Sequence, residues 1–589
     1  MNSFSHCKMA HCFFAPVVAV LLWLTSSSAV HAQRPLERAN VREALPTSTF
    51  FIFQSSNVQA ATKAIATSRF GQRLSDEPWL SLSKQHQEKN IASLLNTLPW
   101  MGIEWRELET VEAKGYFVGF LDSKQKPHVV FLMQLGPNAA THPFVSAWKK
   151  AFTQNRTLKE TSLDETLQIS IAESKKPGVS SAVLAIGPEW TAISSSPIAI
   201  QEWVTSNAKN ALPQNSLYDR SLSKSTSESS VQYWLQPWQL LTNYTEVSEP
   251  KIFGTLEKLG LEQVTECGGE IQFLETPSPS WNVTTEVQWA QPPQDALAVL
   301  SLMEGPSIPL PAIMQGTTEE TKFDNFSMLY LDNKPWFQGV NFLADLSIDE
   351  STPGGFADIL DSLLTDPEGP KIDVRKEVIY KLGNPMILGG STIPDRKKEG
   401  QYQRQLLTAF PFPDTTEMRK ILQRMFEGDE EVTHEDIGDF QVWHTVHNES
   451  LFISLSESET QTITAAAVDK THVYLATDTI WLKKLIETAN QNTPGSVPEK
   501  TDAEPISIKQ YFDLTSWLHR SWLRVPERTP DRKDYESTDL AALVLTNTLV
   551  PQMAASELPP WDKAKDLFGS IEVVGRKTAT GVSLSITWK

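Results

Sequence analysis

A pattern of apolar and polar positions over Ser181–Val204 recurs, without a gap, over Ile463–Ile486. Each stretch reads as an apolar run, a turn, a second apolar run, a short polar break and an amphipathic segment. Few residues are identical, so the pattern that repeats is one of burial. It predicts a β-hairpin followed by an amphipathic helix in both places. The paired positions are Ile193 with Leu475, Ile198 with Ile480, Ile200 with Leu482, Trp203 with Leu485 and Val204 with Ile486.

The segments that precede the two hairpins also correspond. His128–Leu135 is a short apolar run that predicts a strand. Pro137–Phe152 contains apolar residues at helical spacing, which predict a helix. Leu406–Phe426 can be laid on Leu132–Phe152 with its apolar positions matched. We call this succession of strand, helix, two weaker strands, hairpin and helix module B, and we expect two copies of it.

A second arrangement, module A, precedes the first module B. It consists of a predicted strand at Thr49–Gln54, a helix, a second helix at Lys84–Leu98 and a hairpin. Its opening recurs at Ser230–Leu241 and, aligned without gaps, at Ser507–Leu518. Its closing strand recurs as Val283–Trp289 and Val582–Trp588.

The order of modules is therefore A-B, A-insert-B, A. Hairpins and strand-helix units without a regular βαβ rhythm predict an α+β fold, in which repeated modules of antiparallel sheet pack with helices. The expected parts are a signal peptide at 1–32, a first A-B lobe at 43–205, a Ser-rich linker at 206–229, a second lobe at 230–490 that contains the insert 291–401, and a third A module at 505–589.

The N-terminus carries the pattern of a secretory signal peptide. A twelve-residue apolar run, Phe13–Leu24, follows a segment with one lysine, and Val30 and Ala32 place small residues at −3 and −1. We expect cleavage between Ala32 and Gln33 and a secreted or periplasmic location; an uncleaved anchor is the alternative. The mature chain then keeps one thiol, Cys267, which cannot form an intramolecular disulfide, so burial of the core must hold the fold.

The mature chain is acidic. It has 51 basic and 71 acidic residues, a net charge of −20, once Lys8 is removed. This balance disfavours nucleic acid and anionic membranes as partners. No later segment approaches the length of a transmembrane helix. We expect an envelope protein or a polysaccharide as the partner, and no cofactor.

The best candidate for chemistry is the stretch Glu427–His447. Imidazole and carboxylate are zinc ligands, so His434, Glu435, His444 and His447 are candidate metal ligands. Residues three apart on a strand point to opposite faces, however, and the segment ending at His447 reads as a strand. A solvated acidic loop before a strand is therefore the favoured interpretation, and we expect no metal.

The other candidates have simpler explanations. Cys267 stands in a predicted turn, Glu266–Gly269, without a histidine near it in sequence. The tryptophans invite a carbohydrate-binding interpretation, yet several recur at matched core positions, and large rings usually fill cores. The tryptophans considered for stacking on sugars are Trp100, Trp105, Trp234, Trp238, Trp281 and Trp289.

Two short patterns carry a resemblance. Leu45–Thr49 reads Leu-Pro-Thr-Ser-Thr directly after the signal peptide, and Asp373–Gly383 places Asp373 as a helix cap before Glu377 and a closing Leu-Gly. Together they resemble a family of large secreted bacterial proteins, common in planctomycetes, that carry a domain of unknown function. The resemblance implies export and supplies no catalytic residues.

No catalytic residue is assigned by these patterns. They favour an exported, non-enzymatic structural or binding protein of the cell envelope. The alternative is an envelope hydrolase or carbohydrate-binding protein whose site is assembled from residues far apart in sequence.

Overall fold

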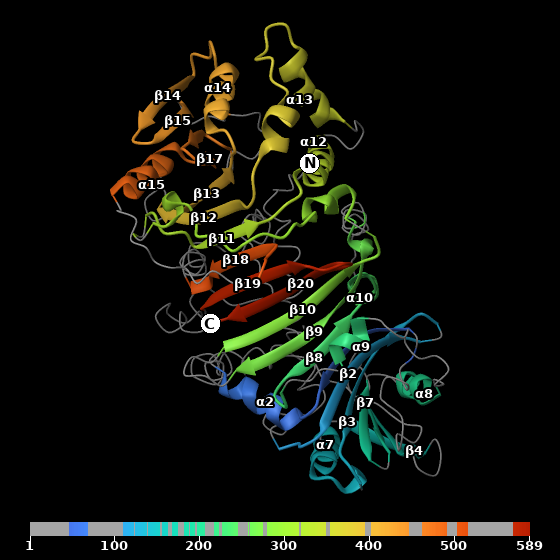
Figure 1. Cartoon of the computed structure of the whole chain (residues 1–589). Coiled ribbons are helices and arrows are strands. Elements are labelled where there is room, and N and C mark those ends of the chain that lie inside the picture. The colour runs from blue at the N-terminus through green and yellow to red at the C-terminus, as the bar shows by residue number, and fades with distance from the viewer. Residues whose placement is uncertain are drawn as a thin grey trace. The chain divides into compact units, whose positions relative to one another are not determined.

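The computed structural model describes the chain from Pro46 onward; its main gaps are 69–109, 206–216, 245–256, 452–461, 492–503 and 516–568, with shorter breaks between them. The predicted signal peptide with its Ala32–Gln33 cleavage site, the predicted helix Lys84–Leu98 and His447 lie outside the described residues. The chain divides into two compact units (Figure 1). The N-terminal unit is formed mainly by residues up to Ala290, and the C-terminal unit mainly by Gln291–Ile586.

Ten of the described strands build the sheet of the N-terminal unit, in the order β10-β9-β8-β1-β2-β3-β7-β6-β5-β4. All nine of these pairings are antiparallel. The strands are β1 (Thr49–Ser55), β2 (Lys114–Leu121), β3 (Pro127–Gln134), β4 (Arg156–Ser162), β5 (Gln168–Ser174), β6 (Ala182–Ile186), β7 (Trp190–Ser194), β8 (Val231–Leu235), β9 (Val264–Leu274) and β10 (Ser280–Trp289). The helices are α2 (Val58–Thr67), α7 (Pro143–Thr153), α8 (Pro197–Thr205), α9 (Leu217–Leu222) and α10 (Pro237–Tyr244), with short 3₁₀ turns between elements.

The C-terminal unit has the same strand order, β20-β19-β18-β11-β12-β13-β17-β16-β15-β14. Its strands are β11 (Asn325–Leu329), β12 (Met386–Pro394), β13 (Tyr402–Pro411), β14 (Val432–Ile437), β15 (Phe440–Thr445), β16 (Ala465–Val468), β17 (His472–Ala476), β18 (Ile508–Asp513), β19 (Ser570–Lys577) and β20 (Gly581–Trp588). Its α-helices are α12 (Asn333–Ile348), α13 (Gly355–Thr365), α14 (Thr415–Met425) and α15 (Thr479–Gln491). A π-helical turn at Val374–Val378 and a 3₁₀ turn at Ile379–Lys381 precede β12.

The two sheets correspond in register as well as in order. In the N-terminal unit Leu184 of β6 lies opposite Ile193 of β7, and in the C-terminal unit Ala466 of β16 lies opposite Leu475 of β17. The gap-free alignment of the two hairpins makes these the same pair. The predicted hairpin and helix are present at both places, as β6-β7-α8 and β16-β17-α15. Each unit is therefore one copy of a ten-stranded arrangement.

Two helices cover opposite faces of the C-terminal sheet, because neighbouring strand residues point to opposite sides. Met418, Ile421 and Leu422 of α14 pack with Ala466 and other residues on one face. Leu482, Leu485 and Ile486 of α15 pack on the other face. The residues of the second face that meet α15 include Val442, Ala465, Ala467, Tyr474 and Ala476. The apolar run of β16 is thus buried on both sides.

The α+β prediction was wrong in its balance, because antiparallel sheet dominates each of the two units. The difference has a physical origin. The stretch 291–401, which the sequence presents as the least patterned, supplies β11, α12, α13 and β12, and these occupy the positions of β1, α2 and β2 in the other unit. The predicted linker 206–229 includes helix α9.

Two details of the alignment also differ. The register makes Ala409 the counterpart of Leu132, since each pairs with the matched residue of the hairpin, Tyr474 and Ala192. The sequence pattern predicts Leu406 at this position, and that prediction is wrong by three residues. Ile198 and Ile480, aligned as burial positions, are both about half exposed, at 50% and 52%. They stand in the first turns of α8 and α15.

Candidate functional site

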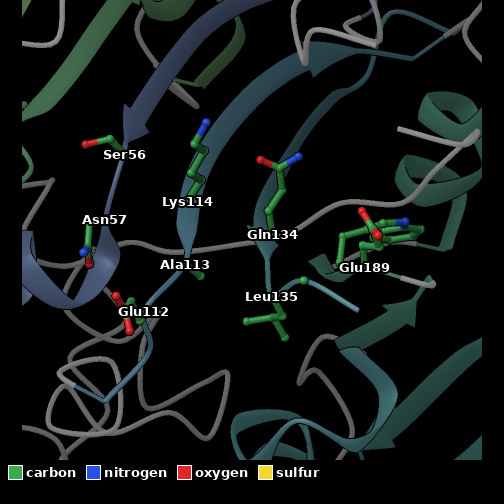
Figure 2. Close-up of a pocket in the computed structure, with 10 residues that line it drawn as sticks. Ser56, Asn57, Glu112, Ala113, Lys114, Gln134, Leu135 and Glu189 are labelled. Carbon is green, nitrogen blue, oxygen red and sulfur yellow. The ribbon is translucent and has the colours of Figure 1, made fainter. Parts of the chain in front are cut away.

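A depression of about 460 Å³ lies at one end of the N-terminal sheet (Figure 2). It is lined by the end of β1, the start of β2, the end of β3 and the start of β7. Because these neighbouring strands are antiparallel, those four strand ends lie at the same end of the sheet. Its lining residues are Ser56, Asn57, Glu112, Ala113, Lys114, Gln134, Leu135, Gly136, Glu189 and Trp190.

One wall of the depression is the start of helix α2. Asn57 caps the helix, and its Oδ1 accepts a hydrogen bond from the Ala60 N–H at 3.0 Å. The N–H groups of the two residues that follow the cap, Val58 and Gln59, donate to the carbonyl oxygens of Ala113 and Val111 at 2.7 and 3.0 Å. These donors are therefore already paired, and this helix start offers no anion site.

The opposite wall is the turn after β3. The N–H groups of Leu135 and Gly136 both donate to the Glu189 carbonyl, at 2.9 and 3.0 Å. Gly136 has a φ of 77°, in the left-handed region that glycine adopts without strain. Trp190 contributes to the lining but is 0% exposed, so its ring belongs to the core and cannot stack on a sugar.

The rim carries the polar side chains. Lys114 and Gln134 are cross-strand partners on β2 and β3, and their side chains project in the same direction in Figure 2. Glu112 and Glu189 are exposed carboxylates of the same depression. An ammonium, an amide and two carboxylates supply hydrogen-bond donors and acceptors to this surface, while the nearby backbone groups are already paired.

The counterpart in the C-terminal unit is built differently. There Phe412 N–H donates to the Thr471 carbonyl at 2.9 Å, which reproduces the bond from Leu135 to Glu189. Asn384, at the position of Ala113, accepts from the Leu331 N–H at 2.8 Å and donates to the Leu331 carbonyl at 2.9 Å. The Asn384 side chain is thus hydrogen-bonded to the Leu331 backbone, whereas the corresponding residue of the other copy, Ala113, lines the depression.

The candidate metal ligands separate in the structure. Cross-strand pairing of β14 with β15 places Glu435 and His444 on one face, where Glu435 Oε1 lies 3.2 Å from His444 Nε2. His434 is on the other face, stacked on Trp443. His447 lies outside the described residues.

A lysine completes the pair of Glu435 and His444. Lys483 of α15 contacts the Glu435 carboxylate and lies 3.1 Å from His444 Nε2. The hydrogen bond from Lys483 is the main cause that lowers the pKa of Glu435, with His444 contributing less. The trio ties α15 to the β14-β15 hairpin with a cation at its centre. Among the described residues, no three His, Cys, Asp or Glu side chains are grouped to hold a metal.

Cys267 lies inside β9 and not in a turn as predicted. It is opposite Val287 of β10 and Leu235 of β8. The glycines that suggested a turn serve close packing, since a Cβ on Gly269 would lie 1.8 Å from the Thr284 carbonyl oxygen of β10. Burial raises the pKa of the Cys267 thiol to about 12, so the thiolate needed for nucleophilic chemistry is scarce at neutral pH.

The tryptophans divide into core and partly covered residues. Trp234 and Trp281 are buried, and the Trp281 ring packs edge-to-face on Phe273 at 5.4 Å. Trp238 and Trp289 are half-buried, while Trp100 and Trp105 lie outside the described residues.

The residues that line the strand-end depression form no sequence motif, because four elements contribute them. Among them only Asn57 carries a local signal, since asparagine is favoured at a helix N-cap.

No helix among the described residues is long and apolar enough to span a bilayer.

Comparison with models of protein families found no match, and comparison with curated proteins found none either. A solved structure described as "Structure of crystal form IV of TP0453" matches over 45% of this chain and 82% of that chain, with 9% sequence identity and a TM-score of 0.24. At that TM-score the likeness carries no argument about fold or function.

Proposed function

We propose that this chain is an exported, non-enzymatic binding or structural protein of the cell envelope that holds a polar partner at the strand-end depression. The observation that carries the proposal is the difference between the copies. Lys114 and Gln134 flank an open depression in one unit, whereas Asn384 bridges the matching position in the other. The shared sheet is a scaffold, and one end of one copy is left accessible to a ligand.

Export is proposed from the sequence. The apolar run Phe13–Leu24 and the small residues before Gln33 support cleavage and transfer across a membrane. The resemblance to secreted planctomycete-type proteins is a proposal of the same kind. A polysaccharide or an envelope protein is the partner that suits this location and the negative charge of the mature chain.

An envelope hydrolase or carbohydrate-binding protein is the second candidate. The observation that favours it is the pair of carboxylates, Glu112 and Glu189, in one depression. Glycoside hydrolysis uses two carboxylic groups that face each other across the bond to be cleaved. A Glu112→Gln and Glu189→Gln double variant would lose hydrolysis of envelope polysaccharide if this candidate were correct.

The proposal is tested with the chain from Gln33 and purified envelope polysaccharide and peptide fractions. We expect one fraction to be retained by the protein, and retention to fall in a Lys114→Ala, Gln134→Ala double variant. Lys126→Ala is the matched control, because Lys126 is exposed in the turn at the other end of the β2-β3 hairpin. Equal retention by the double variant and the control would contradict the proposal, as would release of cleaved products.

A further inference from the structure

A row of four residues crosses the C-terminal sheet on one face. Phe512 of β18 lies opposite Asn325 of β11, Asn325 lies opposite Gly390 of β12, and Gly390 lies opposite Leu406 of β13. Gly390 is buried, whereas the other three are half-buried. The row therefore has an apolar side chain at each end, a glycine as its floor and one amide beside the glycine.

Two polar side chains converge over the glycine. A Cβ placed on Gly390 would lie 2.9 Å from Asn325 Oδ1, 3.2 Å from the amide donor Nδ2 of the same residue and 3.2 Å from Nη2 of Arg404. Arg404 stands two residues before Leu406 on β13, so both side chains leave the same face. The guanidinium and the amide are thus within contact distance of one point above the sheet.

The Arg404 guanidinium has no ion pair or hydrogen bond in the described part of the chain, and its Nε is buried without a partner. Each of the following has a carboxylate or carbonyl partner: Arg220, Arg375, Arg419, Arg424 and Arg576. A half-buried guanidinium without a partner is costly to keep, so a ligand that pairs with it would bind favourably.

The matching row of the N-terminal unit is filled. Gly119 of β2 corresponds to Gly390 of β12, and Phe51 of β1 corresponds to Asn325 of β11. In each unit the two residues lie opposite each other. A Cβ on Gly119 would lie 2.1 Å from the Phe51 ring, which is fully buried. The N-terminal copy thus covers its glycine with its own side chain. The C-terminal copy has a short amide there and an arginine in reach.

We propose that the Gly390 row binds an oxyanion, the carboxylate or phosphate group of a ligand, through Arg404 and Asn325. A guanidinium presents two parallel N–H donors that match either anion, and the Asn325 amide adds a third donor. Phe512 and Leu406 provide apolar sides for the body of the ligand. This site is in the other unit from the strand-end depression, and it stands whether or not the depression binds a partner.

The test is titration of the chain from Gln33 with inorganic phosphate and, separately, with acetate at constant ionic strength, followed by NMR or calorimetry. We expect saturable binding of one anion or both, and the preferred anion identifies the ligand group. Arg404→Gln should weaken it about tenfold or more, the loss of one charge-assisted hydrogen bond. Arg404→Lys should bind more tightly than Arg404→Gln, because it keeps the charge.

Two further variants complete the design. Asn325→Phe installs the residue of the other copy over Gly390 and should abolish binding, with thermal unfolding used to show that the variant is folded. Arg220→Gln is the matched control, since Arg220 is a half-exposed arginine already paired with Glu286 at 2.7 Å. Saturation that survives Arg404→Gln unchanged, or the absence of saturation by both anions in the unaltered chain, would overturn the proposal.

Discussion

Gly119 and Gly390 occupy the same register position in the two sheets, one opposite Phe51 and the other opposite Asn325. Glycine stands at both places, although the residues opposite share no chemistry. In the N-terminal unit the glycine accommodates an aromatic ring in the core. In the C-terminal unit the side chains of Asn325 and Arg404 lie over it. The backbone arrangement is therefore common to both copies, and the side chains above it decide what each copy does.

Replacement of the two glycines should have unequal effects. Gly119→Ala places a Cβ 2.1 Å from the ring of Phe51, which is fully buried. We expect a loss of about 1–3 kcal/mol in the free energy of unfolding, as for other overpacked cores. Gly390→Ala meets the mobile end of Asn325 at 2.9 Å and should cost less than Gly119→Ala. Chemical denaturation of both variants measures this; equal losses would show that the two rows are packed alike.

Neighbouring residues of α15 offer a second comparison. Trp481 is 1% exposed, and its Nε1–H donates to the Glu320 carbonyl at 3.1 Å. Trp481→Ala should reduce the free energy of unfolding by about 3–5 kcal/mol, because a large cavity and an unpaired carbonyl remain. Ile480→Ala, one residue earlier and 52% exposed, should change it by less than about 0.5 kcal/mol. Thermal unfolding of the two variants decides the matter, and a large loss in Ile480→Ala would mean that a partner covers it.

The sequence predicted local structure better than the assembly of strands. The hairpins at Ala182–Ser194 and Ala465–Ala476 were predictable, because their apolar runs are short, continuous and bounded by turn residues. The pairing of β11 with β18 was not, since it joins Asn325–Leu329 to Ile508–Asp513 across most of the unit. Half-buried edge and central strands with mixed composition carry little periodic signal. Their position is fixed by the neighbours and not by the strand itself.

The contact between α15 and the β14-β15 hairpin should depend on pH. Lys483 lowers the pKa of Glu435 from its ordinary value of 4.5, so the charged carboxylate stabilises the folded state above that value. The contribution is lost as pH falls through the lowered pKa. Lys483→Met should therefore be less stable than the unaltered chain at pH 7, by less than about 1 kcal/mol for a partly exposed pair. At a pH well below the lowered pKa of Glu435 the two should converge.

The measurement is chemical denaturation of both proteins across that pH range. Lys470→Met is a suitable control, because Lys470 and its partner Asp439 are both largely exposed, at 73% and 63%. It should show little difference at any pH. A difference for Lys483→Met that grew as pH fell would contradict the assignment of the charged Glu435 as the stabilising form.

Cys267 should react slowly in the folded chain. Its pKa is raised to about 12 by burial in β9, so little thiolate is present at pH 7.5. In the chain from Gln33 it is the one cysteine, and labelling by a thiol reagent reports on it alone. We expect labelling to be at least about tenfold faster after denaturation, since only the unfolded thiol ionises near its ordinary pKa. Rapid labelling of the native chain would contradict this.

The candidate sites lay mostly beyond the reach of sequence reasoning. The cluster around His444 was found from its composition, but its meaning changed once Lys483 of a distant helix came into contact with it. The Gly390 row joins residues from β11, β12, β13 and β18, and none of them belongs to a motif. Such sites follow from strand register, which neither periodicity nor composition specifies.

The central claim is that the two sheets share one register, and cross-linking at their far hairpins tests it most directly. Lys159 lies opposite Ile171 in β4-β5, and Thr433 lies opposite His444 in β14-β15, at matched positions. Directly opposed strand residues are close enough for a disulfide. In a Cys267→Ser background, cysteine pairs at both places should oxidise readily, and pairs shifted by one residue should not. Cross-linking in one hairpin only, or equal cross-linking of the shifted pairs, would contradict the claim.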